Sequence, residues 1–168
     1  MFNYDLSIGT NSIKKKIDRS AVRAVILRGT KILVLKSDNE EVKLPGGGVE
    51  VNETAYDALR REIKEETGYN ISKYKVFGVI TVTAPSQDNK SVLFSMKSDY
   101  FLVEVENKKG QTSLQGYEID LNFKAEFIEI NDAIKINEKA IKNNNLNEIA
   151  HRELIALYEV KKLVFDAS

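Results

Sequence analysis

The sequence contains no cysteine and a single histidine, His151. The absence of cysteine excludes disulfide bonds, thiolate zinc sites and a cysteine nucleophile. It is compatible with a reducing cytoplasm, which is the location we expect. One histidine excludes every mechanism that needs a histidine of a catalytic triad together with a histidine metal ligand.

Long apolar runs and an excess of charge are also absent. No stretch approaches the roughly 20 apolar residues of a membrane helix. The N-terminus lacks the apolar segment and small-residue cleavage site of a signal peptide. The 25 basic and 25 acidic residues cancel, so no overall field favours nucleic acid or an anionic membrane. We therefore expect no nucleic-acid partner and no membrane partner.

The 168 residues fit one domain with a hydrophobic core. Only two prolines occur and no linker-like stretch interrupts the chain, which predicts a single domain over residues 19–168. Residues 1–18 are expected to form an irregular N-terminal arm with a basic patch at Lys14, Lys15 and Lys16. Pairing of two such arms in a homodimer is an open option.

Apolar and β-branched segments predict strands, and periodic apolar residues predict helices. Arg28, Gly29 and Thr30 are the expected hairpin turn between the first two strands. Asn52 and Gly68 are the expected ends of a helix over residues 53–67. The predicted strands are 21–27, 31–36, 76–83, 91–105 (one long strand or a bulged pair) and 119–130. The chain turns helical from residue 131, and the last helix is expected to group Ile149, Leu154, Leu157, Val160 and Val164. This order predicts an α/β (α+β) sandwich with a mixed sheet.

The helix over residues 53–67 carries three glutamates on one arc. At 100° per residue, Glu62, Glu65 and Glu66 fall on the side of the small apolar residues rather than opposite them. Sheltered carboxylates need compensation, and a divalent cation with oxygen ligands supplies it. The alternative from the pattern alone is a solvated glutamate-rich face.

A glycine-rich segment precedes this helix. Gly46, Gly47 and Gly48 allow the backbone to approach a ligand closely. A divalent metal next to phosphates indicates attack by a metal-activated water on a phosphorus–oxygen bond.

The spacing of these residues resembles the signature of the Nudix hydrolase family, G-x5-E-x7-R-E-U-x-E-E-x-G-U, in which U is a bulky apolar residue. Every fixed position matches, and the one soft departure is Tyr69, where an aliphatic residue is more usual. The order of elements extends the resemblance over about residues 20–165. The matching residues are Gly47, Glu53, Arg61, Glu62, Ile63, Glu65, Glu66, Gly68 and Tyr69.

The resemblance implies an α/β/α sandwich and hydrolysis of a nucleoside diphosphate linked to another group, a small-molecule nucleotide-type substrate. It implies Mg²⁺ or Mn²⁺ as cofactor, with Glu62, Glu65 and Glu66 and the Gly46 carbonyl as ligands. One of the three glutamates is implied to deprotonate or orient the water. The implied roles of the remaining residues are structural: an ion pair between Glu53 and Arg61, and backbone requirements at Gly47 and Gly68.

Many family members use a further acidic residue after this motif, and the candidates here are Glu118, Asp120 and Glu126. Arg23 and Lys43 flank the expected site and are able to meet phosphates, although both also suit solvent. Three aromatic residues could stack on a base or belong to the core: Phe94, Tyr100 and Phe101.

Two other functions remain open from the sequence. A nucleotide-sensing module with this fold would bind without cleaving, although the intact glutamates favour catalysis. An isomerase of prenyl diphosphates is disfavoured because that chemistry resembles one using a cysteine. Which diphosphate is cleaved is not decided, because specificity is expected in the loops at residues 84–92 and 106–118.

Overall fold

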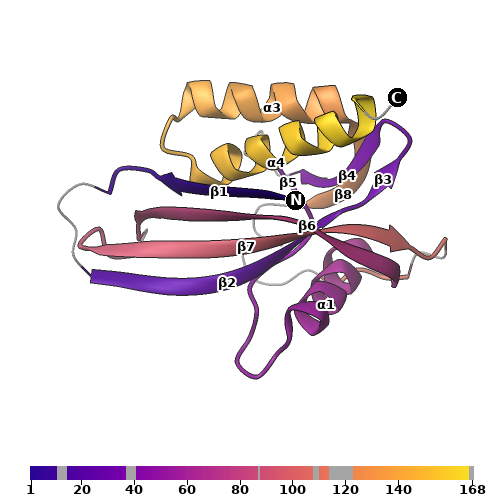
Figure 1. The fold of residues 1–168 in the computed structure, drawn as a ribbon, viewed down its shortest axis with the longest axis horizontal. Helices are drawn as coiled ribbons and strands as arrows, with labels where there is room; N and C mark the ends of the chain where they lie inside the picture. Colours follow the sequence, from indigo (N-terminus) through magenta and orange to yellow (C-terminus); the bar gives the residue numbers. More distant parts are fainter. Residues whose placement is uncertain (11–14, 37–40, 87, 108–109, 114–122, 167–168) are drawn as a thin grey trace.

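The computed structural model describes residues 1–10, 15–36, 41–86, 88–107, 110–113 and 123–166. The strands lie between two helical layers (Figure 1). Helix α1 (Ala55–Thr67) lies on one side of them. Helices α3 (Ile130–Asn143) and α4 (Glu148–Phe165) pack together on the other side. The predicted α/β/α sandwich is confirmed.

The larger sheet is mixed, as expected, and has the strand order β1–β6–β7–β2. Its long central strands are antiparallel, whereas each edge strand is parallel to its neighbour. The strands are β1 (Phe2–Ser7), β2 (Lys15–Val25), β6 (Ile71–Pro85) and β7 (Val92–Val105). Residues 92–105 form one strand rather than a bulged pair, and the irregularities lie in its register with β6.

The smaller sheet is antiparallel and is centred on β4. The chain passes from β2 directly into β3, and the expected hairpin turn at Gly29, whose φ is 60°, joins β3 to β4. Its strands are β3 (Leu27–Arg28), β4 (Lys31–Lys36), β5 (Val42–Lys43) and β8 (Lys124–Glu129). Of the strand predicted over residues 119–130, residues 119–122 lie outside the described residues.

Alternate residues of β2 and β7 face opposite helical layers, so the sheet builds two cores. Val22, Ala24 and Phe101 pack with the apolar side of α1. Val25 and Tyr100 pack with α3 and α4. Because both faces are covered here, residues 21–25 of β2 are buried without alternation.

The irregular structure expected for residues 1–18 is wrong for residues 2–7 and 15–18, which form strands. Residues 2–7 form β1, which pairs in parallel with β6. Phe2 is buried against Tyr100 and Phe77, and a Cβ on Gly78 would lie 2.4 Å from its ring. Lys15 and Lys16 are exposed residues of β2. The buried Phe2 ring and pairing with a long strand order a segment whose sequence is mostly polar.

The expected start of helix α1 is also wrong, by two residues. The N-cap is Thr54, whose side chain accepts a hydrogen bond from Asp57 N at 3.1 Å. Asn52 instead has a φ of 65° in the preceding turn. Gly68 ends the helix as expected, with a φ of 75° and its N–H donating to Lys64 O at 3.0 Å. In the part of the chain that is described, none of the helices is long and apolar enough to cross a membrane.

Asn137 joins helix α3 to the short strand β5. Its side chain is fully buried, donates to Val42 O at 3.0 Å and accepts from Val42 N at 3.0 Å. These two bonds hold the strand that leads into Lys43 and the glycine segment, so the amide supports the site described below.

We expect Asn137→Ala to lower the free energy of unfolding by about 2–4 kcal/mol, because both bonded groups of Val42 lose a buried partner. Urea unfolding followed by circular dichroism measures this change. The control is Asn70→Ala, which removes an exposed bond to Glu106 and should change the free energy by less than about 0.5 kcal/mol. Equal unfolding midpoints for the two variants would contradict the role assigned to Asn137.

Candidate active site around helix α1

The three glutamates of the motif lie on the sheltered side of α1. Glu66 is 2% exposed, and the side chains of Glu62 and Glu65 are 12% and 26% exposed. The helix buries Ala58, Leu59 and Ile63 on the sheet and turns Asp57, Arg60 and Lys64 to solvent. The arc expected from the sequence is therefore confirmed, and the alternative of a solvated glutamate face is excluded.

Glu66 is the most deeply buried of these carboxylates, and it holds the strand before the helix. Its Oε1 accepts from Lys43 Nζ at 3.0 Å, and its Oε2 accepts from Gly46 N at 2.6 Å. Lys43 is itself 3% exposed and lies over the ring of Phe123, 4.7 Å from the centroid. The buried Glu66 carboxylate and the buried Lys43 ammonium thus neutralise each other where helix α1 contacts the segment that leads into the glycines.

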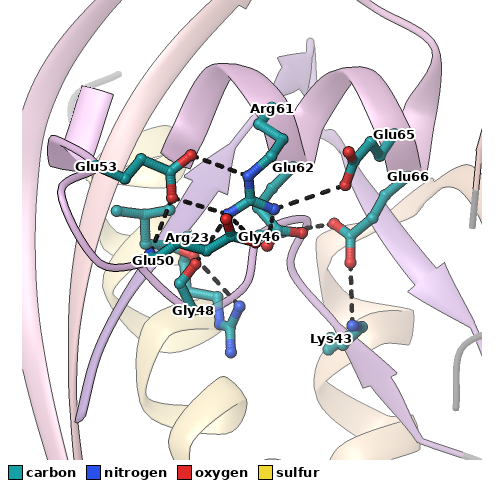
Figure 2. Close-up of polar contacts among 11 residues, drawn as sticks. Arg23, Lys43, Gly46, Gly48, Glu50, Glu53, Arg61, Glu62, Glu65 and Glu66 are labelled. Atoms are coloured by element: carbon teal, nitrogen blue, oxygen red, sulfur yellow. Dashed lines mark hydrogen bonds and ion pairs between the residues drawn. The ribbon is translucent and has the colours of Figure 1, made fainter. Parts of the chain in front are cut away.

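Arg61 links three parts of the site (Figure 2). Its Nε and Nη2 donate to the two oxygens of Glu53, each at 2.9 Å. Nη1 donates to Glu62 Oε1 at 2.7 Å and lies 3.6 Å from Glu65 Oε2. Nη2 also donates to Gly48 O at 3.0 Å. The hydrogen bonds with Glu53 raise the pKa of Arg61 and lower that of Glu53, so both groups are charged at neutral pH.

The glycine segment runs along β2 as an added strand. Gly47 O accepts from Val22 N at 2.9 Å, and Val49 N donates to Ser20 O at 2.9 Å. Gly46 has a φ of 136°, and a Cβ there would lie 2.1 Å from Val22 O. A residue with a side chain is therefore excluded at Gly46 by both conformation and space.

Gly47 is required for a different reason, which is the position of Glu62. A Cβ on Gly47 would lie 2.2 Å from Glu62 Oε1. The carboxylate of Glu62 therefore packs directly on the Cα of this glycine. By contrast, a Cβ on Gly48 would have no heavy atom within 4 Å.

The donor set fits a hard divalent cation in kind, because it consists of sheltered carboxylates beside an unobstructed backbone. In the residues described, no three acidic or histidine side chains converge as a metal-binding group. Instead, Arg61 contacts Glu62 and Glu65, and Lys43 contacts Glu66. The metal-binding roles of these glutamates and of the Gly46 carbonyl stay predictions.

The other predicted site residues are distributed differently. Glu118 and Asp120 lie outside the described residues. Glu126 lies on β8 with a 47% exposed side chain, 3.8 Å from Lys36 Nζ. His151 has Nε2 2.8 Å from Asn145 O near the start of α4. Of the three aromatic candidates, Tyr100 and Phe101 are buried on opposite faces of β7, and Phe94 is half-buried.

Of the two options left open for Arg23 and Lys43, exposure to solvent is excluded, because both are buried. Lys43 is buried together with Glu66, whereas Arg23 lies beside an ion pair that sequence analysis missed, Arg152–Glu153 on α4. Glu153 Oε1 accepts from Arg152 Nη2 at 2.7 Å and lies 3.8 Å from Arg23 Nε. The sequence does contain an indication that Glu153 is buried. Glu153 lies at helical spacing from Ile149, Ala156 and Val160, on the side of the helix where an apolar residue is usual.

We expect the contribution of Glu53 to stability to depend on pH. Because hydrogen bonds from Arg61 lower the pKa of Glu53 in the folded state, ionised Glu53 stabilises the fold above about pH 4.3, the ordinary glutamate value. This stabilisation is lost as the pH falls through the lowered folded-state pKa. Glu53→Gln should lower the free energy of unfolding by about 1–2 kcal/mol at neutral pH, and by much less in acid.

Urea unfolding at a series of pH values between neutral and strongly acid measures this difference. The matched control is Glu104→Gln, in which the substituted residue is 68% exposed and pairs with Lys73 at 3.4 Å. Its effect should be smaller at neutral pH, because exposed ion pairs contribute little. A Glu53→Gln effect of the same size at every pH would contradict the ionic role of Glu53.

Comparison with solved structures supports the fold. A MutT NUDIX hydrolase from Burkholderia pseudomallei superposes with a TM-score of 0.59 at 19% identity, covering 86% of this chain and 98% of that one. An ADP compounds hydrolase superposes with a TM-score of 0.57 at 18% identity, covering 89% of this chain and 75% of that one.

Comparison of sequences identifies the family. An ADP-ribose pyrophosphatase of Methanocaldococcus jannaschii is 35% identical over 106 residues, which make up 61% of this chain and 62% of that protein. The match thus spans less than two thirds of the relative. The family model of the NUDIX domain matches residues 18–153, which include the complete glycine segment, helix α1 and both long strands. The chain therefore belongs to the Nudix hydrolase family.

Proposed function

We propose that this protein hydrolyses the diphosphate linkage of a nucleoside diphosphate derivative and depends on Mg²⁺ or Mn²⁺. The observation that carries the proposal is the packing of the Glu62 carboxylate on the Cα of Gly47, with Glu65 and Glu66 on the same sheltered arc. This arrangement places three carboxylates, with their cationic partners Arg61 and Lys43, beside a backbone that no side chain obstructs. Such a site suits a divalent cation and a diphosphate together, but not an anion alone.

The metal would be held by Glu62, Glu65 and Glu66 with the Gly46 carbonyl. When bound, it would lower the pKa of a coordinated water and offset charge on the phosphate oxygens. Arg61 orients Glu62 and approaches Glu65, and its own position is held by Glu53. One glutamate of the three orients the attacking water or takes its proton.

ADP-ribose is the first substrate to test, because the similar archaeal protein is an ADP-ribose pyrophosphatase. Attack of water on one phosphorus, with cleavage of the bond to the bridging oxygen, would yield AMP and ribose 5-phosphate. We expect these products with Mg²⁺ or Mn²⁺ and none with excess EDTA, as measured by chromatography of the reaction mixture.

Glu65→Gln is the sharpest test of the acidic site. Glu65 is more exposed than Glu66, so its substitution does not break the buried pair with Lys43. We expect kcat to fall on the order of 100-fold with little change in stability, because a charge that acts on the reacting phosphate is lost. Glu104→Gln, an exposed substitution of the same kind, should leave kcat unchanged.

Two results would contradict the proposed function. One is a Glu65→Gln variant as active as the wild-type protein, and the other is turnover that persists in EDTA. Tight binding of ADP-ribose without turnover in Mg²⁺ would instead favour a nucleotide-sensing module.

A second prediction concerns Gly47, where the close contact with Glu62 makes any side chain disruptive. Gly47→Ala should push the Glu62 carboxylate away and lower kcat by on the order of tenfold or more. The effect on the free energy of unfolding should stay below about 1 kcal/mol, because the displaced atoms end a flexible side chain.

The double variant Gly47→Ala/Glu62→Asp distinguishes a clash from a general perturbation. The shorter side chain of aspartate relieves the contact with the added Cβ. The fold decrease in kcat of the double variant should therefore be smaller than the product of the fold decreases of the two single variants. Strictly multiplicative losses would show that the Gly47–Glu62 contact is not the cause.

A further inference from the structure

A group of unsatisfied polar atoms lies on the face of the larger sheet that α4 covers. Among the described residues, three buried side-chain atoms make no hydrogen bond of ordinary geometry: Arg23 Nε, Ser98 Oγ and Tyr100 Oη, the last of which still interacts with Arg152. In the parallel register of β2 and β7, Arg23 is paired with Tyr100, and Ala21 with Ser98. The three side chains therefore share one face. Buried polar groups are normally paired, so their concentration on one face calls for an explanation.

The charges around these atoms are unevenly matched. Glu153 Oε1 accepts from Arg152 Nε at 3.0 Å and Nη2 at 2.7 Å, and Glu153 Oε2 accepts from Leu44 N at 3.1 Å. Arg23 Nε reaches the same carboxylate only at 3.8 Å, and Arg23 Nη1 donates to the neighbouring Val22 O at 3.3 Å. One carboxylate thus serves two buried guanidinium groups, and it is engaged mainly by Arg152.

The electrostatic setting of Arg23 favours an added negative charge. Burial and the positive charge of Arg152 lower the pKa of Arg23. The side chains of Arg23 and Arg152 each remain 7% exposed, whereas that of Glu153 is 1% exposed. The carboxylate is thus slightly more enclosed than either guanidinium group.

Arg23 is connected to the proposed catalytic residues through the glycine segment (Figure 2). It follows Val22, whose N–H is bonded to Gly47 O, and Gly47 carries the Glu62 carboxylate against its Cα. The backbone of the glycine segment thus lies between the α1 carboxylates and the α4 guanidinium groups. A Cβ on Gly48 would meet no heavy atom within 4 Å, so the space next to that residue is open.

We propose that Arg23, supported by Arg152, binds a phosphoryl oxyanion of the diphosphate substrate on the α4 side of the glycine segment. The inference rests on the proposed function and adds a substrate-binding residue to it. A guanidinium group donates two parallel hydrogen bonds to a phosphoryl group, and such charge-assisted bonds are strong where water is excluded. The oxyanion would supply an acceptor for Arg23 Nε, which makes no hydrogen bond within the described residues, and a second negative charge beside Glu153.

Calorimetric titration of inorganic pyrophosphate into the protein in excess EDTA tests the proposal without any turnover. We expect the wild-type protein to bind pyrophosphate and Arg23→Gln to bind it at least about tenfold more weakly. Arg23→Lys, which keeps the charge but loses the planar fork, should fall between them. Arg60→Gln removes an exposed arginine of α1 and should bind as the wild-type protein does.

Three results would overturn the proposal: no pyrophosphate binding by the wild-type protein, equal binding by Arg23→Gln, or failure of Arg23→Gln to fold. The last result would assign Arg23 a structural role, and thermal unfolding by circular dichroism detects it. The titration also separates this inference from the proposed function. If the protein binds pyrophosphate through Arg23 but cleaves no diphosphate, the proposed binding role of Arg23 stands and the proposed hydrolase function fails. If the protein is an active hydrolase but Arg23→Gln binds pyrophosphate as the wild-type protein does, the hydrolase function stands and the binding role of Arg23 fails.

Discussion

The ion pair between Arg61 and Glu53 is the interaction on which the rest of the site depends. Arg61 has a fixed planar fork, and two of its N–H groups are occupied by the two oxygens of Glu53. Its remaining contacts then fall on Glu62 and on the carbonyl of Gly48. The contacts of Arg61 thereby fix the positions of the loop before α1, the helix and the glycine segment relative to one another. Without this cation, the clustered carboxylates would repel one another at short range.

Buried charge is present on both sides of the glycine segment. On the α1 side, Glu66 is paired with Lys43, and on the α4 side, Glu153 is shared by Arg152 and Arg23. Replacing buried ion pairs by apolar residues is often neutral or stabilising, so stability alone does not account for them. Binding of a polyanionic substrate together with cations, as proposed above, would give both groups a role besides stability.

Much of the fold and of the site is predictable from local pattern. The helix with Gly68 at its end, the hairpin at Gly29 and the mixed sheet all follow from turn residues and apolar periodicity. The start of α1 was misplaced because Asn52 and Thr54 are both good N-caps, and the backbone turn decides between them. Strand β1 was missed because its mostly polar residues are ordered by a single buried ring, Phe2, and by pairing with β6.

The sequence by itself determined the acidic helix, the glycine segment and the family, because these depend on residues at short, fixed spacing. Only the tertiary structure decided which charged groups are buried. Arg23, Lys43 and Glu153 lie far apart in the chain, and no local pattern brings them together. Their burial arises where β2, β5 and α4 meet around the glycine segment, since the environment of a charge is set by everything that packs around it.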